Sequence, residues 1–257
     1  MALTRTANPA LNKKTFQGYS LTTGAETMTL QGTVGKIIIM MFLVLAGAIY
    51  TWRLFFQALQ GDPEAVIGSI WMYPMIGGIG GFIVALITIF RKKLAPYTAP
   101  IYSVLEGLLL GGISAIAEIR FPGIVIQAVT LTFGVLFALL IAYKTKLIKP
   151  TQNFRLGVAA ATGGIFLVYL ITFILNLFGF NMYYLHNGSW FSIGFSLFVV
   201  VIAALNLVLD FDFIESGAET GAPKFMEWYA AFGLMVTFIW LYIEILRLLI
   251  MIAARRK

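Results

Sequence analysis

The chain alternates between long apolar runs and short polar segments along almost its whole length. Several apolar runs exceed about 18 residues, the length at which a membrane-spanning helix is the expected structure. Charged residues, Pro and Gly interrupt the runs and delimit seven predicted helices, at residues 37–59, 66–90, 99–117, 124–143, 156–178, 190–209 and 230–252. The pattern therefore predicts an all-α polytopic membrane protein with seven transmembrane helices.

The same pattern divides the chain into three parts. Residues 1–36 are a polar basic N-terminal arm, residues 37–252 the seven-helix transmembrane domain, and residues 253–257 a basic C-terminal tail. The arm holds no short apolar core followed by a small-residue cleavage site, so we expect the first spanning helix itself to direct insertion.

Composition narrows the function classes further. With 60% hydrophobic and 11% charged residues, the chain is neither an ordinary soluble domain nor a disordered one. It has no cysteine and one histidine, His186, which excludes thiol nucleophiles, Cys-ligated metals and any site that needs two histidines. The net charge of +7 comes mostly from Lys and Arg between the apolar runs, where they set topology. We therefore expect no nucleic-acid partner and no cofactor.

The basic residues also predict the orientation of the helices. Most of them lie on the N-terminal arm and on the second, fourth and sixth connections. The positive-inside rule then places the N-terminus in the cytoplasm and, after seven spans, the C-terminus outside. The basic residues 255–257 favour the cytoplasm instead. A last pair of segments that dips into the membrane and returns would remove this conflict.

Two pairs of glycines predict close helix contacts. Gly77 and Gly81 in one predicted helix, and Gly107 and Gly111 in the next, have the GxxxG spacing that lets backbones approach inside a membrane. A nucleotide-binding loop is excluded because no strand precedes these glycines and no GxxxxGK motif follows.

Ionisable side chains inside apolar helices are the strongest candidates for function, since each costs roughly 2.5 to 3.5 kcal/mol to insert. Glu106 lies about seven residues into the third predicted helix, with Tyr102 and Ser103 on the same face. The two hydroxyls can line a route to the carboxylate. Alternatively, Glu106 is a structural acid that is hydrogen-bonded across the bundle.

Four acids follow the sixth apolar run. Asp210 ends that run and has Asn206 one turn before it on the same face, which favours an interior position. Asp212, Glu215 and Glu219 come after it. For these acids, and most of all for Glu215 and Glu219, the alternative is a solvated acidic loop. An EF-hand is excluded because Ile214 and Glu215 would occupy positions that need a ligand and a glycine.

Glu244 lies in the last predicted helix, between apolar residues on both sides. Trp240 precedes it by four residues and Arg247 follows by three, so one stripe carries an aromatic residue, an acid and a base. The structural alternative is an ion pair within the helix that neutralises both groups for insertion.

Three motifs together resemble one known family. EGLLLG in the third helix, LNLVLDFDFIE at the end of the sixth and LYIEILRLL in the seventh resemble the Bax inhibitor (transmembrane Bax-inhibitor-motif) family, most closely its bacterial branch. The resemblance implies six helices around a central C-terminal seventh, in the plasma (inner) membrane of a bacterium. It also implies a pH-sensitive cation leak channel that passes calcium through a pair of acids on helices six and seven.

The resemblance assigns the two acids to Asp210 and Glu244, which would bind calcium transiently, and matches the family's Glu-Gly to Glu106 and Gly107. Asn206, Asp212, Glu215 and Arg247 are candidate supporting residues. The chain departs from its relatives in having Glu rather than Asp at residue 244. It also lacks a base in the second helix before Arg91, where relatives have one that locks the acid pair, so Arg247 is the nearest candidate lock.

Asp210 and Glu244 are 34 residues apart, and helix counting does not bring them to one depth. We therefore expect residues 223–232 to form a short interfacial or re-entrant helix that takes up the difference. Two carboxylates that then meet in a poorly hydrated site would share a proton. Loss of that proton as the pH rises would push the helices apart or attract a divalent cation, and open the path.

Functions from other classes remain as alternatives. The main one is a regulatory membrane protein that does not transport and that modulates a membrane protease or a stress or cell-death pathway, with the N-terminal arm as its recognition tail. A proton-coupled carrier is a third hypothesis. We expect no enzymatic activity, because the patterns of intramembrane aspartyl proteases are absent. The expected partners are therefore the lipid bilayer, cations, protons and, in the regulatory case, another membrane protein; the oligomeric state is left open.

Overall fold

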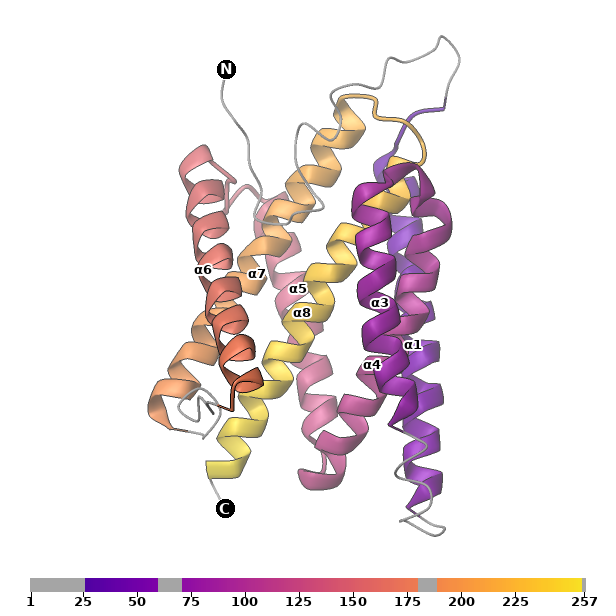
Figure 1. Ribbon diagram of the computed structural model, residues 1–257. Coiled ribbons are helices and arrows are strands. Elements are labelled where there is room, and N and C mark those ends of the chain that lie inside the picture. Colours follow the sequence, from indigo (N-terminus) through magenta and orange to yellow (C-terminus); the bar gives the residue numbers. More distant parts are fainter. Residues whose placement is uncertain (1–25, 60–70, 180–188, 256–257) are drawn as a thin grey trace. The chain divides into compact units, whose positions relative to one another are not determined.

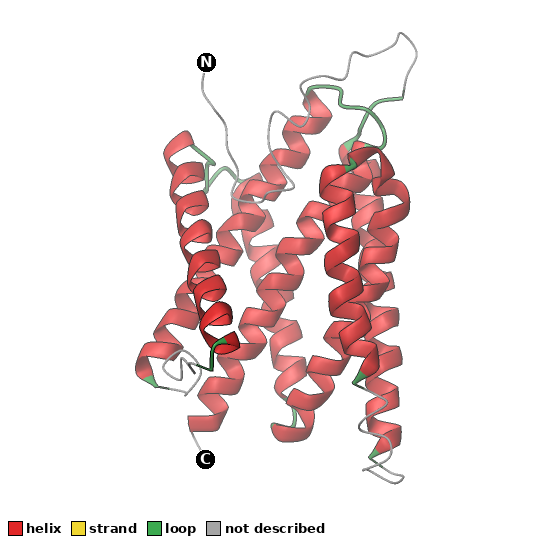
Figure 2. Ribbon diagram, in the orientation of Figure 1, coloured by secondary structure: helices red, strands yellow, loops and turns green. Residues whose placement is uncertain are grey.

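Seven long helices account for most of the structure, a computed structural model that describes residues 26–59, 71–179 and 189–255 (Figure 1). They are α1 (Leu30–Ala58), α3 (Met72–Phe90), α4 (Ala95–Arg120), α5 (Ile124–Lys144), α6 (Gln152–Leu177), α7 (Trp190–Glu219) and α8 (Met226–Arg255), with the short 3₁₀ helix η2 (Lys92–Leu94) before α4. All seven are long and apolar enough to cross a membrane. Within the described residues Figure 2 shows helices and loops but no strand arrow. The chain is an all-α polytopic membrane protein, as predicted.

Three helix boundaries differ from the predicted ones in ways that matter. Helix α1 begins at Leu30 rather than at residue 37, because Thr29 caps it: the Thr29 hydroxyl accepts a hydrogen bond from the Gly32 N–H. Helix α7 continues through the acids to Glu219, so the predicted solvated acidic loop is wrong, although Glu215 and Glu219 are exposed. In both α1 and α7, the helix continues through polar residues beyond the apolar run from which it was predicted.

The third difference is a correction to the last part of the chain. Residues 223–232 do not form a separate short helix, because α8 begins at Met226 and is a single helix from there to Arg255. The predicted last pair of segments that dips in and returns gains no support, since α7 and α8 are each 30 residues long and so long enough to span a membrane. At the end of α8 the Arg255 guanidinium lies 3.7 Å from the centroid of the Trp190 ring, a cation–π contact that places this base beside the start of α7.

The chain consists of two compact units, which we describe separately. The first unit contains Gly123–Asp212 and Thr237–Lys257, and so holds α5, α6, most of α7 and the C-terminal part of α8. The second contains Lys14–Pro122 and Phe213–Val236, and so holds α1, α3, η2, α4, the end of α7 and the start of α8. The arrangement of six helices around a central seventh stays a prediction.

Glycines determine how the helices of the second unit pack. The Gly107 Cα of α4 lies against Gly47 and the Val44 carbonyl of α1, and Gly111 lies against the backbone of Ala48. A Cβ on Gly77 of α3 would meet the Leu105 carbonyl and the Leu109 N–H of α4. The predicted close contacts at both GxxxG pairs are therefore confirmed: small residues let α1 and α3 each approach the backbone of α4.

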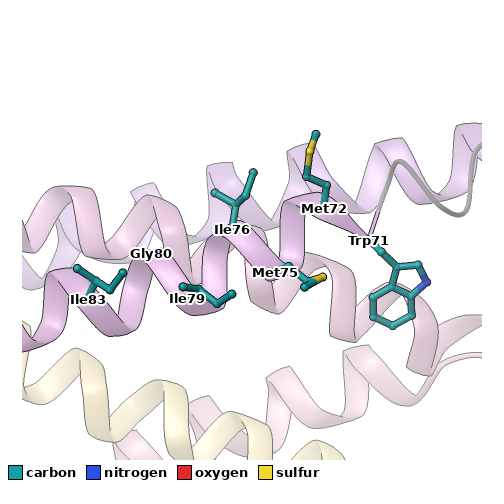
Figure 3. A pocket seen from close by; sticks show the side chains of 7 residues that line it. All are labelled: Trp71, Met72, Met75, Ile76, Ile79, Gly80 and Ile83. Atoms are coloured by element: carbon teal, nitrogen blue, oxygen red, sulfur yellow. The ribbon is translucent and has the colours of Figure 1, made fainter.

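The outward face of α3 carries an apolar hollow. Figure 3 shows the residues that line it, all from this helix and its start: Trp71, Met72, Met75, Ile76, Ile79, Gly80 and Ile83. Their large side chains are exposed, Met75 and Ile79 to about 60%. In a spanning helix such a face meets hydrocarbon, where apolar side chains are at no disadvantage.

Candidate functional site

One side of α6 carries a polar residue at every seventh position. Arg155, Thr162 and Tyr169 follow one another at this spacing, which places them on one face of the helix, over a length of about 21 Å. Each forms a hydrogen bond with a different residue of α7 or α8. We call these three residues the polar face of α6; the rest of α6 is mostly exposed and apolar.

The first of the three contacts involves Glu244. The Tyr169 hydroxyl donates a hydrogen bond to Glu244 Oε1 at 2.8 Å, and Arg247 Nη1 donates one to the same hydroxyl at 2.7 Å. Arg247 Nη1 also lies 3.7 Å from Glu244 Oε2, and its guanidinium lies 5.4 Å from the centroid of the Tyr169 ring. Tyr169 therefore links the acid and the base that the sequence placed on one stripe of α8. Glu244 is only 4% exposed.

The middle contact supports the helix that carries Asp210. The Asn206 amide of α7 donates hydrogen bonds to the Thr162 hydroxyl at 2.8 Å and to the Ile202 carbonyl at 2.9 Å. Asp210, one turn further along α7, is fully buried, as its position after the apolar run predicted. Asn206 is thus a fixed structural partner of α6 on the same face as the buried acid.

The third contact is an ion pair. Arg155 Nη2 lies 2.6 Å from Asp212 Oδ2, and both side chains are largely buried, with 11% and 16% exposed. A pair with this geometry is costly to break, because the remaining charge would lack its counter-ion in a poorly hydrated place. Arg155 therefore fixes the start of α6 to α7 two residues after Asp210.

Counted from the connection between α7 and α8, Asp210 and Glu244 do not lie at matching positions along their helices. Asp210 lies nine residues before the end of α7 at Glu219, and Glu244 lies 18 residues after the start of α8 at Met226. At 1.5 Å per residue these two distances along the helices differ by about 14 Å, or two and a half helical turns. The short helix that was expected to remove this difference does not exist.

Glu106 belongs to the second unit. It is 9% exposed, and a Cβ on Gly81 of α3 would lie 2.7 Å from its Oε1 atom, so Gly81 leaves the space that the carboxylate occupies. Tyr102, one turn earlier, is buried and packs edge-on against Phe232 at a centroid distance of 4.9 Å. Ser103 bonds back to the Ala99 carbonyl at 3.0 Å. Whether Glu106 lines a route or is a structural acid bonded across the bundle therefore stays open.

No multidentate metal site accompanies these acids in the ranges described. No group of three or more His, Cys, Asp or Glu residues there can hold a metal ion together. A cation near Asp210 or Glu244 would therefore complete its coordination with water, hydroxyl or carbonyl oxygens, as Ca²⁺ readily does. His186 lies outside the described residues.

Sequence reasoning missed the partners on α6. Arg155 was counted only as a topological charge, and Thr162 and Tyr169 looked like ordinary residues of an apolar helix. The seven-residue spacing was the available signal, because in an otherwise apolar helix it places polar groups on one side. Which residue of α7 or α8 each would contact depends on packing and was not visible in the sequence.

A comparison with known protein families gives a match over most of the chain. A model of the family described as Bax inhibitor 1 like matches residues 8–254. The chain belongs to this family. The match covers all seven helices, so the resemblance inferred from the three motifs is confirmed for the Bax inhibitor family as a whole. No curated protein and no solved structure matches the chain.

Proposed function

We propose that this Bax inhibitor family protein is a pH-sensitive leak channel for cations, with calcium as the ion, in which Glu244 acts as the gate. The observation that carries this proposal is the buried Glu244 near the middle of α8, joined to α6 through the Tyr169 hydroxyl and lying beside Arg247. Ionisable groups at such depth are costly to insert and usually serve ion or proton movement.

Protonation of Glu244 is the proposed gating step. The charged carboxylate faces Tyr169 from α6, and Arg247 and the Trp240 indole from α8. Its negative charge stabilises the contact between the two helices. Protonation of Glu244 removes its attraction to Arg247. The guanidinium then keeps its charge in a poorly hydrated site without the negative charge of Glu244, and the contact between α6 and α8 weakens. We therefore expect the leak to rise as the pH falls.

This direction reverses the one expected from two carboxylates that share a proton. In that hypothesis Asp210 repels Glu244 at high pH and the path opens. Here Glu244 has a base beside it, and Asp210 lies about two and a half turns closer to the α7–α8 connection along its own helix, so we expect attraction to Arg247 to outweigh repulsion. A leak that rises with pH would instead support gating by a proton shared between Asp210 and Glu244.

The other acids serve as sites for the ion in this proposal. Asp210 is buried beyond the Asn206 contact, and Glu106 is a buried carboxylate with a tyrosine one turn before it. Carboxylate oxygens are the ligands that Ca²⁺ prefers. Asp212 is paired with Arg155 and Glu215 is exposed, which makes both supporting residues rather than steps of the path. We further propose a bacterial plasma membrane location with a cytoplasmic N-terminus, on the distribution of basic residues.

Calcium entry into liposomes that hold purified protein and a trapped indicator tests the proposal between about pH 6 and pH 8. We expect pH-dependent flux in the wild type, loss of the pH dependence in Glu244→Gln, and weaker flux in Asp210→Asn. Glu219→Gln, an exposed acid at the end of α7, is the matched control and should behave as the wild type. Absence of flux at every pH, in protein shown to be folded, would overturn the channel proposal.

A regulatory protein without transport is the second candidate, and the fastening of the segment before α1 to the α7–α8 connection favours it. The Met28 N–H donates to the Ala222 carbonyl at 2.6 Å, so the segment before α1 is bonded to the connection between the two helices that carry Asp210 and Glu244. Deleting residues 1–25 separates the two functions. The regulatory function would be lost with the arm and would survive Asp210→Asn, whereas the leak would depend on the acids.

A further inference from the structure

The segment Glu26–Thr29, just before α1, is bonded along its backbone to the connection between α7 and α8. The Met28 N–H donates to the Ala222 carbonyl at 2.6 Å, and the Lys224 N–H donates to the Glu26 carbonyl at 3.1 Å. Thr27 and Pro223 form an isolated antiparallel bridge, and Met28 is almost completely buried. We call this segment the strap.

A carboxylate from α8 fastens the strap. Glu227, in the first turn of α8, is fully buried and accepts hydrogen bonds from the Thr29 N–H at 2.9 Å and from the Thr29 hydroxyl at 3.0 Å. The Thr29 hydroxyl in turn accepts one from the Gly32 N–H at 3.0 Å. Glu227 therefore binds the N-cap residue of α1, 198 residues away in the sequence.

These contacts reproduce a capping box whose two halves come from different helices. In the usual motif an N-cap Ser or Thr bonds the N–H of the third helical residue, and a Glu or Gln at that third position returns a bond to the N-cap N–H. In α1 the third position is Gly32, and Glu227 of α8 supplies the missing carboxylate. A Cβ at residue 32 would overlap the carboxyl group of Glu227, so the glycine is what admits the acid.

Two lysines neutralise the buried carboxylate. Lys36, one turn beyond Gly32 in α1, forms a salt bridge with Glu227 Oε2, and Lys224 Nζ lies 3.3 Å from Oε1. Lys36 also lies 5.6 Å from the centroid of the Trp228 ring. Because a buried acid is stable only when it is paired and hydrogen-bonded, these contacts make Glu227 a fixed joint between α1 and α8.

We propose that the strap and Glu227 hold the start of α8 in place and thereby set the position of Glu244, so that Glu227 is a positioning residue for the gate. Glu227 and Glu244 lie 17 residues apart on one continuous helix. A movement of its first turn is therefore carried along α8 to the contact with Tyr169. This inference rests on the leak function proposed above. It goes further in naming the N-terminal segment as the element through which that gate is regulated.

Two variants separate a positioning role from simple stabilisation of α1. Glu227→Gln weakens the joint. The double variant Gly32→Glu with Glu227→Ala restores the capping box within α1 while removing its connection to α8. We expect both to raise the initial calcium leak by roughly five-fold at neutral pH, the change expected when a two-state equilibrium loses one such hydrogen-bonded connection. Glu219→Gln, which removes an exposed acid at the end of α7, is the control for loss of an acid beside this connection and should leave the leak unchanged.

Hydrogen exchange provides a readout that does not depend on transport. In the double variant we expect the backbone N–H of residue 32 to stay protected by the restored cap. The N–H groups of Met28 and Lys224 should exchange faster as the strap loosens. A double variant with wild-type leak, or with unchanged exchange at Met28 and Lys224, would overturn the inference. If the wild type itself does not conduct, the proposed function fails, and the exchange at these two residues still decides whether Glu227 fastens the strap.

Discussion

Tyr169 of α6 donates a 2.8 Å hydrogen bond to Glu244 of α8 and so joins the two helices at the only acid in the apolar part of α8 within the described residues. The phenol oxygen also accepts a hydrogen bond from Arg247, which lies one turn further along α8. One hydroxyl thus satisfies an acid and a base at once. Its removal affects both groups, which makes Tyr169 the most informative residue to change.

Tyr169→Phe should lower stability and loosen the gate. Loss of the hydroxyl leaves Glu244 Oε1 without its donor in a buried place, a change that costs about 1 to 3 kcal/mol. We expect a lower melting temperature in detergent and a faster leak in liposomes. Tyr97→Phe is the matched control, since Tyr97 is 73% exposed and should tolerate the change. Equal effects of the two substitutions would contradict the role of the Tyr169 hydroxyl.

Arg247→Gln should abolish the response of the leak to acid. In the wild type, protonation of Glu244 weakens its attraction to the guanidinium, so flux should rise as the pH falls from about 8 to 6. Without the base this attraction is absent at every pH, and the flux should be high and nearly constant. Initial rates of calcium entry across that range check the expectation. An acid response that persists in Arg247→Gln would assign the switch to another group.

The Arg155–Asp212 pair should show strong coupling in a double-mutant cycle. Arg155→Met and Asp212→Asn each deprive one charge of this counter-ion in a largely buried place, which costs about 3 to 5 kcal/mol when burial is complete and less here. The double variant removes both charges and should be more stable than either single variant. Thermal unfolding of the four proteins measures the coupling energy. Additive effects would show that the ion pair contributes little.

Gly107→Ala should separate α1 from α4. The new methyl group would meet the Val44 carbonyl and the Gly47 Cα, and such overpacking costs about 1 to 3 kcal/mol. Gly134→Ala of α5 is the control, because a Cβ there meets nothing within 4 Å. Alanine forms helices better than glycine, so the control should be neutral or stabilising by about 0.5 to 1 kcal/mol. Unfolding in detergent distinguishes the two.

The sequence predicted the helices well because each needs about 20 apolar residues to cross a membrane. The glycine contacts were equally visible, since Gly107 and Gly111 have a spacing whose meaning is steric. The errors arose where polar residues continue a helix beyond its apolar part. Thr29 starts α1 before the apolar run, and α7 carries its acids past the predicted end at residue 209.

The candidate site was predictable by residue but not by partner. Asp210, Glu244 and Glu106 are all buried, as their positions in apolar runs indicated. Arg247 was a candidate lock, and it does lie beside Glu244, but the link through Tyr169 required knowledge of which face of α6 meets α8. The role of Glu227 was invisible for the same reason. Its partner Thr29 lies almost 200 residues earlier, and Gly32 marks the contact only by lacking a side chain.

The shared capping box also bears on how the protein is made. Synthesis proceeds from the N-terminus, so α1 enters the membrane first and α8 last. The carboxylate that completes the start of α1 is therefore produced only with the last helix. Until α8 is inserted, the first turn of α1 lacks one of its partners, and the arrival of Glu227 closes the fold at both ends of the chain. Ribosome-bound chains that stop before residue 227 should consequently hold α1 with a frayed first turn.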